Sequence, residues 1–296
     1  LRLCYNSYLG AMDNKRRKIS MLVAIMMFWF TISFITNILG PLIPDIVKNF
    51  RLKDLTMAGF IPTSFFLAYA IMSIPAGILI DKYGEKIVLF IGFLMPFVGS
   101  VLFASVPCYP MLLVSSFIIG IGMAMLQTVI NPLQRTVGGE ENYAFIAELA
   151  QFVFGVASFV SPLVYTWMIH ALDSDIYEPG ANWFLDVLAG LIPAELPWVA
   201  LYWIFTILLF AMLLIVCFVR FPRIELKDDE RSGTSQSYGE LFKQKYVWIY
   251  FIGIFCYVSI EQGVSIYMSS FLEKYHGVDP STEGARVISY FWGAMT

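Results

Sequence analysis

Seven apolar stretches dominate this sequence, and each is long enough to cross a lipid bilayer. They cover residues 19–43, 56–80, 86–106, 110–132, 144–170, 196–220 and 246–271. A membrane-spanning helix needs about 20 predominantly apolar residues. The stretches are continuous, whereas the strands of a membrane barrel alternate over about ten residues. Only 14% of the residues are charged, against roughly one quarter in soluble domains, so the sequence predicts an all-α integral membrane protein.

An eighth apolar stretch begins near Val287 and reaches Thr296, the last residue. The sequence also starts with Leu1 where a complete protein would start with methionine. We therefore expect the sequence to be part of a longer protein.

The distribution of Lys and Arg predicts an orientation in the membrane. Segments 1–18, 81–86, 133–143 and 220–245 hold 14 of the 19 basic residues. These segments share one side if the seven stretches cross the bilayer in turn, and loops rich in Lys and Arg stay cytoplasmic. We expect a multi-pass protein of the cell membrane with a cytoplasmic N-terminus.

One long polar interruption divides the chain. We predict a cytoplasmic N-terminal segment over 1–18, a six-helix bundle over 19–220 and a cytoplasmic linker over 221–245, which is rich in charge, Ser and Gly. Residues 246–296 would then begin a second bundle. This layout is typical of a two-bundle transporter.

A charged loop, GILIDKYGEK at 77–86, separates the second and third apolar stretches. Gly77 would permit close approach of two helices, and Gly84 would permit a tight turn. Asp81 can accept hydrogen bonds at a helix end, and Lys86 would face an anionic lipid surface. The loop resembles the pattern G-x-L-x-D-[RK]-x-G-[RK]-[RK] of major facilitator transporters, apart from Glu85, and that resemblance implies a conformational latch. The alternative is a generic charged loop.

Gln127 and Asn131 lie four residues apart in the fourth stretch, so they share one face of a helix. Pro132 is expected to end this helix at the cytoplasmic boundary, with Arg135 just beyond. Polar side chains at membrane depth usually face a bundle interior or a watery cavity. The alternative is that the two amides only join helices by hydrogen bonds.

Three other stretches carry polar side chains at similar intervals. They are Ser33 and Asn37 in the first, Glu148, Gln151, Gly155, Ser158 and Pro162 in the fifth, and Glu261, Gln262 and Ser265 in the seventh. A carboxylate at membrane depth costs roughly 2.5–3.5 kcal/mol on insertion scales, so Glu261 needs a functional or a structural partner. Glu148 lies near the inner end of its helix, where we expect it to join Arg135 in the latch.

These side chains suit a ligand that is rich in hydroxyl groups. Asn and Gln offer both donors and acceptors, as a sugar does. The candidate substrate-binding residues are Asn37, Gln127, Asn131, Gln151, Glu261 and Gln262. The candidate gating residues are Gly77, Asp81, Gly84, Lys86, Arg135 and Glu148.

Three longer strings resemble the fucose:proton symporter family, with its bacterial sugar transporters, within the major facilitator superfamily. They are PAGILIDKYGEK at 75–86, LQTVINPLQRTVGGEENYAFIAELAQFVFG at 126–155 and YVSIEQGVSIYMSSFLEKYHGVDP at 257–280. The resemblance implies a twelve-helix fold of two six-helix bundles, of which this chain would hold the first six helices, the seventh and part of the eighth. It also implies a central sugar site and alternating access by rocking of the bundles.

Two departures bear on coupling to an ion. Proton-coupled fucose members of the family have Glu where this chain has Gln127, and Asp where it has Asn37. Neither amide can titrate. Three options stay open: Glu261 as a proton site, sodium coupling, or a facilitator without coupling. We expect coupled uptake.

Other classes of protein fit the sequence less well. GVASFVSP at 155–162 resembles the fifth-helix motif of antiporters but lacks its paired glycines, so efflux of a drug or metabolite is the alternative function. The two His residues and four Cys residues show no metal-ligand spacing. We expect no enzyme activity, metal, cofactor or nucleic-acid partner, and a monomer in the lipid bilayer.

Overall fold

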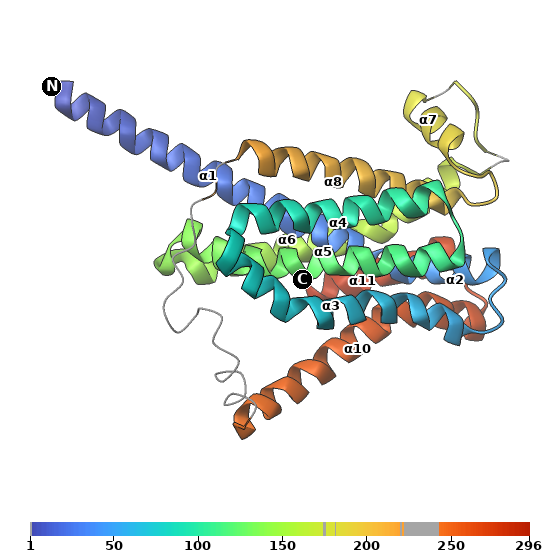
Figure 1. The fold of residues 1–296 in the computed structure, drawn as a ribbon. Coiled ribbons are helices and arrows are strands. Elements are labelled where there is room, and N and C mark those ends of the chain that lie inside the picture. The colour runs from blue at the N-terminus through green and yellow to red at the C-terminus, as the bar shows by residue number, and fades with distance from the viewer. Residues whose placement is uncertain (1, 174–175, 181, 220, 222–242) are drawn as a thin grey trace.

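The computed structural model describes residues 2–173, 176–180, 182–219, 221 and 243–296, and the described part consists of helices and connecting loops (Figure 1). The helices are α1 (Arg2–Asn37), α2 (Leu39–Asn49), α3 (Leu55–Tyr83), α4 (Glu85–Ser105), α5 (Tyr109–Gly138), α6 (Tyr143–Ala171), α7 (Trp183–Leu191), α8 (Ala200–Phe218), α10 (Lys245–His276) and α11 (Ala285–Met295). Short helical turns lie at Glu140–Asn142, Pro197–Val199 and Pro280–Gly284.

All seven predicted spans are present as helices that are long and apolar enough to cross a membrane. They run over Lys18–Asn49, Leu55–Tyr83, Glu85–Ser105, Tyr109–Gly138, Glu140–Ala171, Pro197–Phe218 and Lys245–His276. The eighth predicted stretch is α11. The all-α membrane fold is therefore confirmed.

The first span is two helices rather than one. α1 ends at Asn37, and α2 begins at Leu39 after a break at Ile38. Pro41 has no N–H to donate four residues back, so the carbonyl of Asn37 loses its partner in a continuous helix. The break therefore follows from the sequence Gly40–Pro41 and lies at the depth of the polar side chains.

The prediction that Pro132 ends its helix is wrong. α5 continues through Pro132 to Gly138, and Gly139 adopts a positive φ of 80° just beyond. A proline inside a helix removes one backbone hydrogen bond, and membrane helices tolerate this loss where neighbouring groups compensate. The turn at Gly139 ends the helix instead.

Close contacts between small residues hold α5 in the centre of the bundle. A Cβ on Gly120 would collide with the carbonyl oxygen of Phe65 in α3, and one on Gly122 would collide with Pro96 in α4. Without a hydrophobic force between helices in lipid, such close backbone approach provides the packing energy. Glycine at these positions therefore fixes α3, α4 and α5 as one unit.

The last two helices contact the bundle through α2 and α6. α10 packs on α2, and α11 packs on α6. Residues 245–260 of α10 are exposed apart from the half-buried Val247, and α10 diverges from the bundle toward the end where α1 begins (Figure 1). Most of the predicted linker, residues 222–242, lies outside the described part, so the division of the chain at 221–245 stays a prediction.

Candidate functional site

A cluster of polar side chains joins α1 to α6 inside the bundle. The Oγ atoms of Ser33 and Ser158 lie 2.7 Å apart, and the Asn37 amide donates to Ser158 Oγ at 2.8 Å. Ser33 Oγ also donates to the carbonyl oxygen of Phe154 at 2.6 Å. Asn37 is only 3% exposed. We call Ser33, Asn37 and Ser158 the α1–α6 polar cluster.

One buried oxygen of this cluster, Asn37 Oδ1, has no hydrogen-bond partner among the described residues. The buried hydroxyls of Thr36 and Tyr69 lie next to each other. Almost every buried polar atom in a folded protein is hydrogen-bonded. Asn37 Oδ1 therefore has free capacity for a polar ligand or for water.

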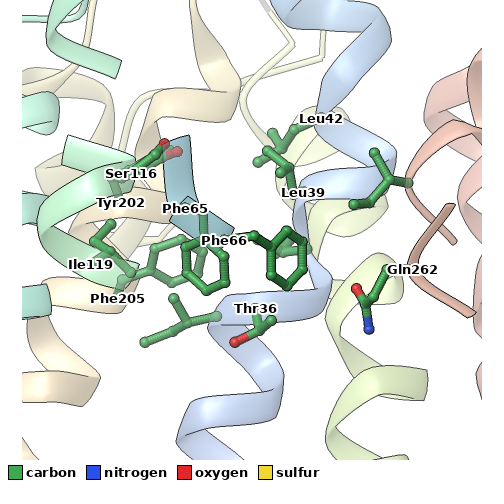
Figure 2. A pocket seen from close by; sticks show the side chains of 13 residues that line it. Thr36, Leu39, Leu42, Phe65, Phe66, Ser116, Ile119, Tyr202, Phe205 and Gln262 are labelled. Atoms are coloured by element: carbon green, nitrogen blue, oxygen red, sulfur yellow. The ribbon is translucent and has the colours of Figure 1, made fainter. Parts of the chain in front are cut away.

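A small cavity lies at the break between α1 and α2. Its volume is about 40 Å³. Its walls come from α1, α2, α3, α5, α8 and α10 and include Thr36, Ser116, Tyr202 and Gln262. In Figure 2, Phe65, Phe66 and Phe205 gather on one side of Thr36, and Gln262 lies on the other side. A water needs roughly 10–15 Å³ by this kind of measure, so the cavity admits water but not a sugar.

The amides of α5 do not contact the α1–α6 polar cluster in the described structure. Gln127 is half-buried and Asn131 is exposed. The Asn131 amide donates to the carbonyl oxygen of Gln127 at 3.0 Å, within its own helix. The shared face follows from their spacing, and their role in binding stays a prediction.

The remaining predicted binding residues lie on α6 and α10. Gln151 is exposed and lies one turn from Gly155, which contacts Thr296 of α11. Glu261 is half-buried, and Tyr257 lies one turn before it on α10. The structure thus places Asn37 at the break in the first span and Gln262 in the wall of the adjacent cavity. The binding roles of all six predicted residues stay predictions.

A second buried polar contact joins α1 to α5, and it was not predicted from the sequence. The indole Nε1 of Trp29 donates to Gln134 Oε1 at 2.9 Å, and Gln134 is 3% exposed. Gln134 lies seven residues after Gln127, which is two helical turns along the same face. The seven-residue spacing could have predicted that Gln134 lies on the polar face of this helix. Thr36 was also missed, because a single threonine in an apolar run carries no periodicity.

The predicted latch loop is only partly as expected. Gly84 has φ of 82°, which confirms the tight turn between α3 and α4. Lys86 Nζ donates to the carbonyl oxygen of Cys217 in α8 at 3.0 Å. At Gly77, no described atom lies within 4 Å of the position of a Cβ, so the close helix approach expected there is not made within the described part of the chain.

Arg135 and Glu140 form an ion pair of 3.0 Å at the turn between α5 and α6. Both side chains are partly exposed, at 35% and 66%, so this pair stabilises the fold by about 1 kcal/mol or less. Glu148 is exposed on α6. The joint role of Arg135, Glu148 and Asp81 in a latch stays a prediction.

The α1–α6 polar cluster predicts a stability effect at Ser158. Ser158→Ala removes the nearer acceptor of the buried Asn37 amide and leaves it only Ser33 Oγ at 3.4 Å, which costs about 1–3 kcal/mol of stability. We expect a lower midpoint of thermal unfolding for the purified variant. Thr63→Ala is the control, because the Thr63 hydroxyl bonds only to Gly59 of its own helix on an exposed face.

A double variant separates this hydrogen bond from general packing effects. Asn37→Leu combined with Ser158→Ala removes both partners, so it should lose less stability than the sum of the single variants. Strictly additive losses would contradict a direct energetic link between the two side chains.

Comparisons with known proteins agree with this architecture. The sequence matches the Major Facilitator Superfamily over residues 21–296. A glucose/galactose transporter of Brucella abortus biovar 1 (strain 9-941) is 27% identical over 281 residues, which are 92% of this chain and 63% of that protein. The L-fucose-proton symporter of Escherichia coli (strain K12) is 32% identical over 135 residues, which are 45% of this chain and 30% of that protein. The chain spans less than two thirds of the length of these relatives.

Solved structures share the fold at low sequence identity. A crystal structure of the E. coli fucose:proton symporter matches with a TM-score of 0.60 at 22% identity, covering 87% of this chain and 63% of the other. A bacterial homologue of the human lysosomal transporter Spinster, inward-facing and occupied, matches with a TM-score of 0.72 at 18% identity, covering 91% and 58%. The family match covers nearly the whole sequence, and the chain therefore belongs to the Major Facilitator Superfamily.

Proposed function

We propose that the protein containing this chain imports a sugar, a hexose or related polyol, by alternating access. The observation that carries the proposal is the set of buried polar groups at the break in the first span. Asn37 holds a buried unpartnered oxygen there, and Thr36 of α1 and Gln262 of α10 line the adjacent cavity. A polyol supplies hydroxyl groups that can act as donors to such oxygens.

The relatives support the choice of substrate. The names of two of them record glucose, galactose and L-fucose as the transported sugars. All three are hydroxyl-rich hexoses or deoxyhexoses. Drug efflux remains the alternative, because the antiporter-like string at 155–162 lies on α6.

The arrangement of the two parts supports alternating access. At the end of the bundle away from the start of α1, Thr166 of α6 donates to the Ser281 carbonyl oxygen at 2.7 Å. Gly40 of α2 also lies against the carbonyl oxygen of Ser265 in α10. At the other end α10 diverges from the bundle (Figure 1). Because the cavity is too small for a sugar, binding requires α10 to move relative to α1 and α3.

Uptake measurements test the binding residues directly. Gln127→Ala and Gln151→Ala remove amide groups that would pair with substrate hydroxyls, so each should lower initial uptake of radiolabelled D-glucose, D-galactose or L-fucose by roughly tenfold. Asn182→Ala is the control, because Asn182 caps the peripheral helix α7. Normal uptake by both glutamine variants would remove them from the site, and export of an amphipathic dye without sugar uptake would favour efflux.

Coupling to an ion centres on Glu261 in the proposed mechanism. It is the carboxylate of α10 that lies one residue before Gln262, at membrane depth. Glu261→Gln keeps the shape and hydrogen-bonding capacity of the side chain but cannot titrate. We expect this variant to lose accumulation against a gradient and to keep sugar exchange at equilibrium.

The coupling experiment varies the pH gradient and the sodium gradient separately in vesicles. Glu273→Gln, at the far end of α10, is the matched control. Wild-type uptake that responds to neither gradient would exclude coupling and leave an uncoupled facilitator. Normal accumulation by Glu261→Gln would exclude Glu261 as the coupling group.

The proposed orientation places the N-terminus in the cytoplasm of the cell. It rests on the excess of Lys and Arg at one end of the bundle. A membrane-impermeant amine reagent added to intact cells should then label Lys274, at the outer end of α10, and leave Lys82 unlabelled until the cells are opened. Labelling of Lys82 in intact cells would reverse the orientation.

A further inference from the structure

An apolar groove of about 740 Å³ lies between residues 18–30 of α1 and the first half of α6, away from the candidate sugar site. On α1 its walls include Leu22, Met26 and Phe30, and on α6 they include Phe145 and Leu149. Lys18 and Asn142 are the polar side chains among the residues that line it. We propose that this groove binds one anionic phospholipid, with an acyl chain between the helices and the phosphate at Lys18.

The groove opens toward lipid. Ile19, Val23 and Met27 follow one another at intervals of four on α1 and are 51%, 53% and 41% exposed. Phe145 on α6 is 71% exposed. A row of exposed apolar side chains on a membrane-spanning helix suits contact with acyl chains. The groove is therefore a recess in the exposed apolar surface of the described part of the chain.

Helix geometry separates the groove from the contact between α6 and α11. Leu149 and Gly155 are six residues apart, which is about 120° around the helix axis. Gly155 faces Thr296 of α11, whereas Leu149 lines the groove. A lipid in the groove would therefore not occupy the surface where the two parts of the chain meet.

The length of the groove matches one leaflet. From Lys18 to Phe30 the helix rises about 18 Å, at about 1.5 Å per residue. Half of a hydrocarbon core of about 30 Å is about 15 Å. An acyl chain that starts at Lys18 would therefore reach the middle of the bilayer at Phe30.

Charge complementarity selects an anionic headgroup. Lys18 is exposed where the first span begins, and it follows Lys15, Arg16 and Arg17 in the sequence of α1. Basic residues next to a membrane span attract anionic lipids by about 1 kcal/mol each. Asn142 adds an amide donor at the same end of the groove.

Lys18 is the charged side chain among the residues that line the groove, and Glu140, at the turn before α6, is paired with Arg135 at 3.0 Å. The groove therefore presents a positive charge to a phosphate.

Photolabelling tests the proposal in vesicles of phosphatidylcholine that contain phosphatidylglycerol. A phosphatidylglycerol with a photoactivatable group in its acyl chain should label peptides from α1 and the first half of α6. Lys18→Gln should reduce this labelling about fivefold, equivalent to the loss of ~1 kcal/mol, and Lys18→Arg should retain it. Lys82→Gln is the matched control at another exposed lysine of the same membrane face.

A second pair of variants tests the groove without changing any charge. Val23→Trp fills the groove and should reduce labelling of α6, whereas Leu163→Trp adds the same ring to an exposed site on α6 outside the groove and should not. Phosphatidylcholine with the same photoactivatable group should label all lipid-facing helices evenly. Equal labelling by the two lipids, or unchanged labelling in both Lys18→Gln and Val23→Trp, would overturn the proposal.

Discussion

The hydrocarbon core contains no water, so polar groups of this chain at membrane depth depend on partners within the protein. This constraint fixes the helical architecture, since helices satisfy their own backbone groups. It also explains why Asn37 is held by Ser33 and Ser158, and why the indole of Trp29 meets Gln134. The bundle is organised by these few contacts and by close glycine packing, because lipid supplies no hydrophobic force between helices.

The spans were predictable because the length of an apolar run is a physical requirement of the bilayer. The break in the first span was less visible. Gly40 and Pro41 mark it in the sequence, but only the structure places the polar cluster and the cavity beside it. Pro132 misled the sequence analysis, because the rule that proline ends a helix comes from helices in water, and α5 continues to Gly138.

The candidate site could be predicted only in part. Spacing identified the shared faces of Ser33 with Asn37 and of Gln127 with Asn131, since side chains four residues apart lie on one side of a helix. Spacing within one helix carries no information about the neighbouring helix. The contact of Asn37 with Ser158 therefore had to be observed, and so did the ion pair of Arg135 with Glu140.

The break at Ile38 has a mechanical consequence. If the first span were one continuous helix, a tilt of that helix at its contact with α10 would also move the α1–α6 polar cluster. Here Gly40, which touches Ser265 of α10, and Asn37, which is tied to α6, belong to separate helices. The missing N–H of Pro41 also means that a change of angle at this joint sacrifices no hydrogen bond there. The first span thus has a joint at Ile38, between the helix that contacts α10 and the helix that is tied to α6.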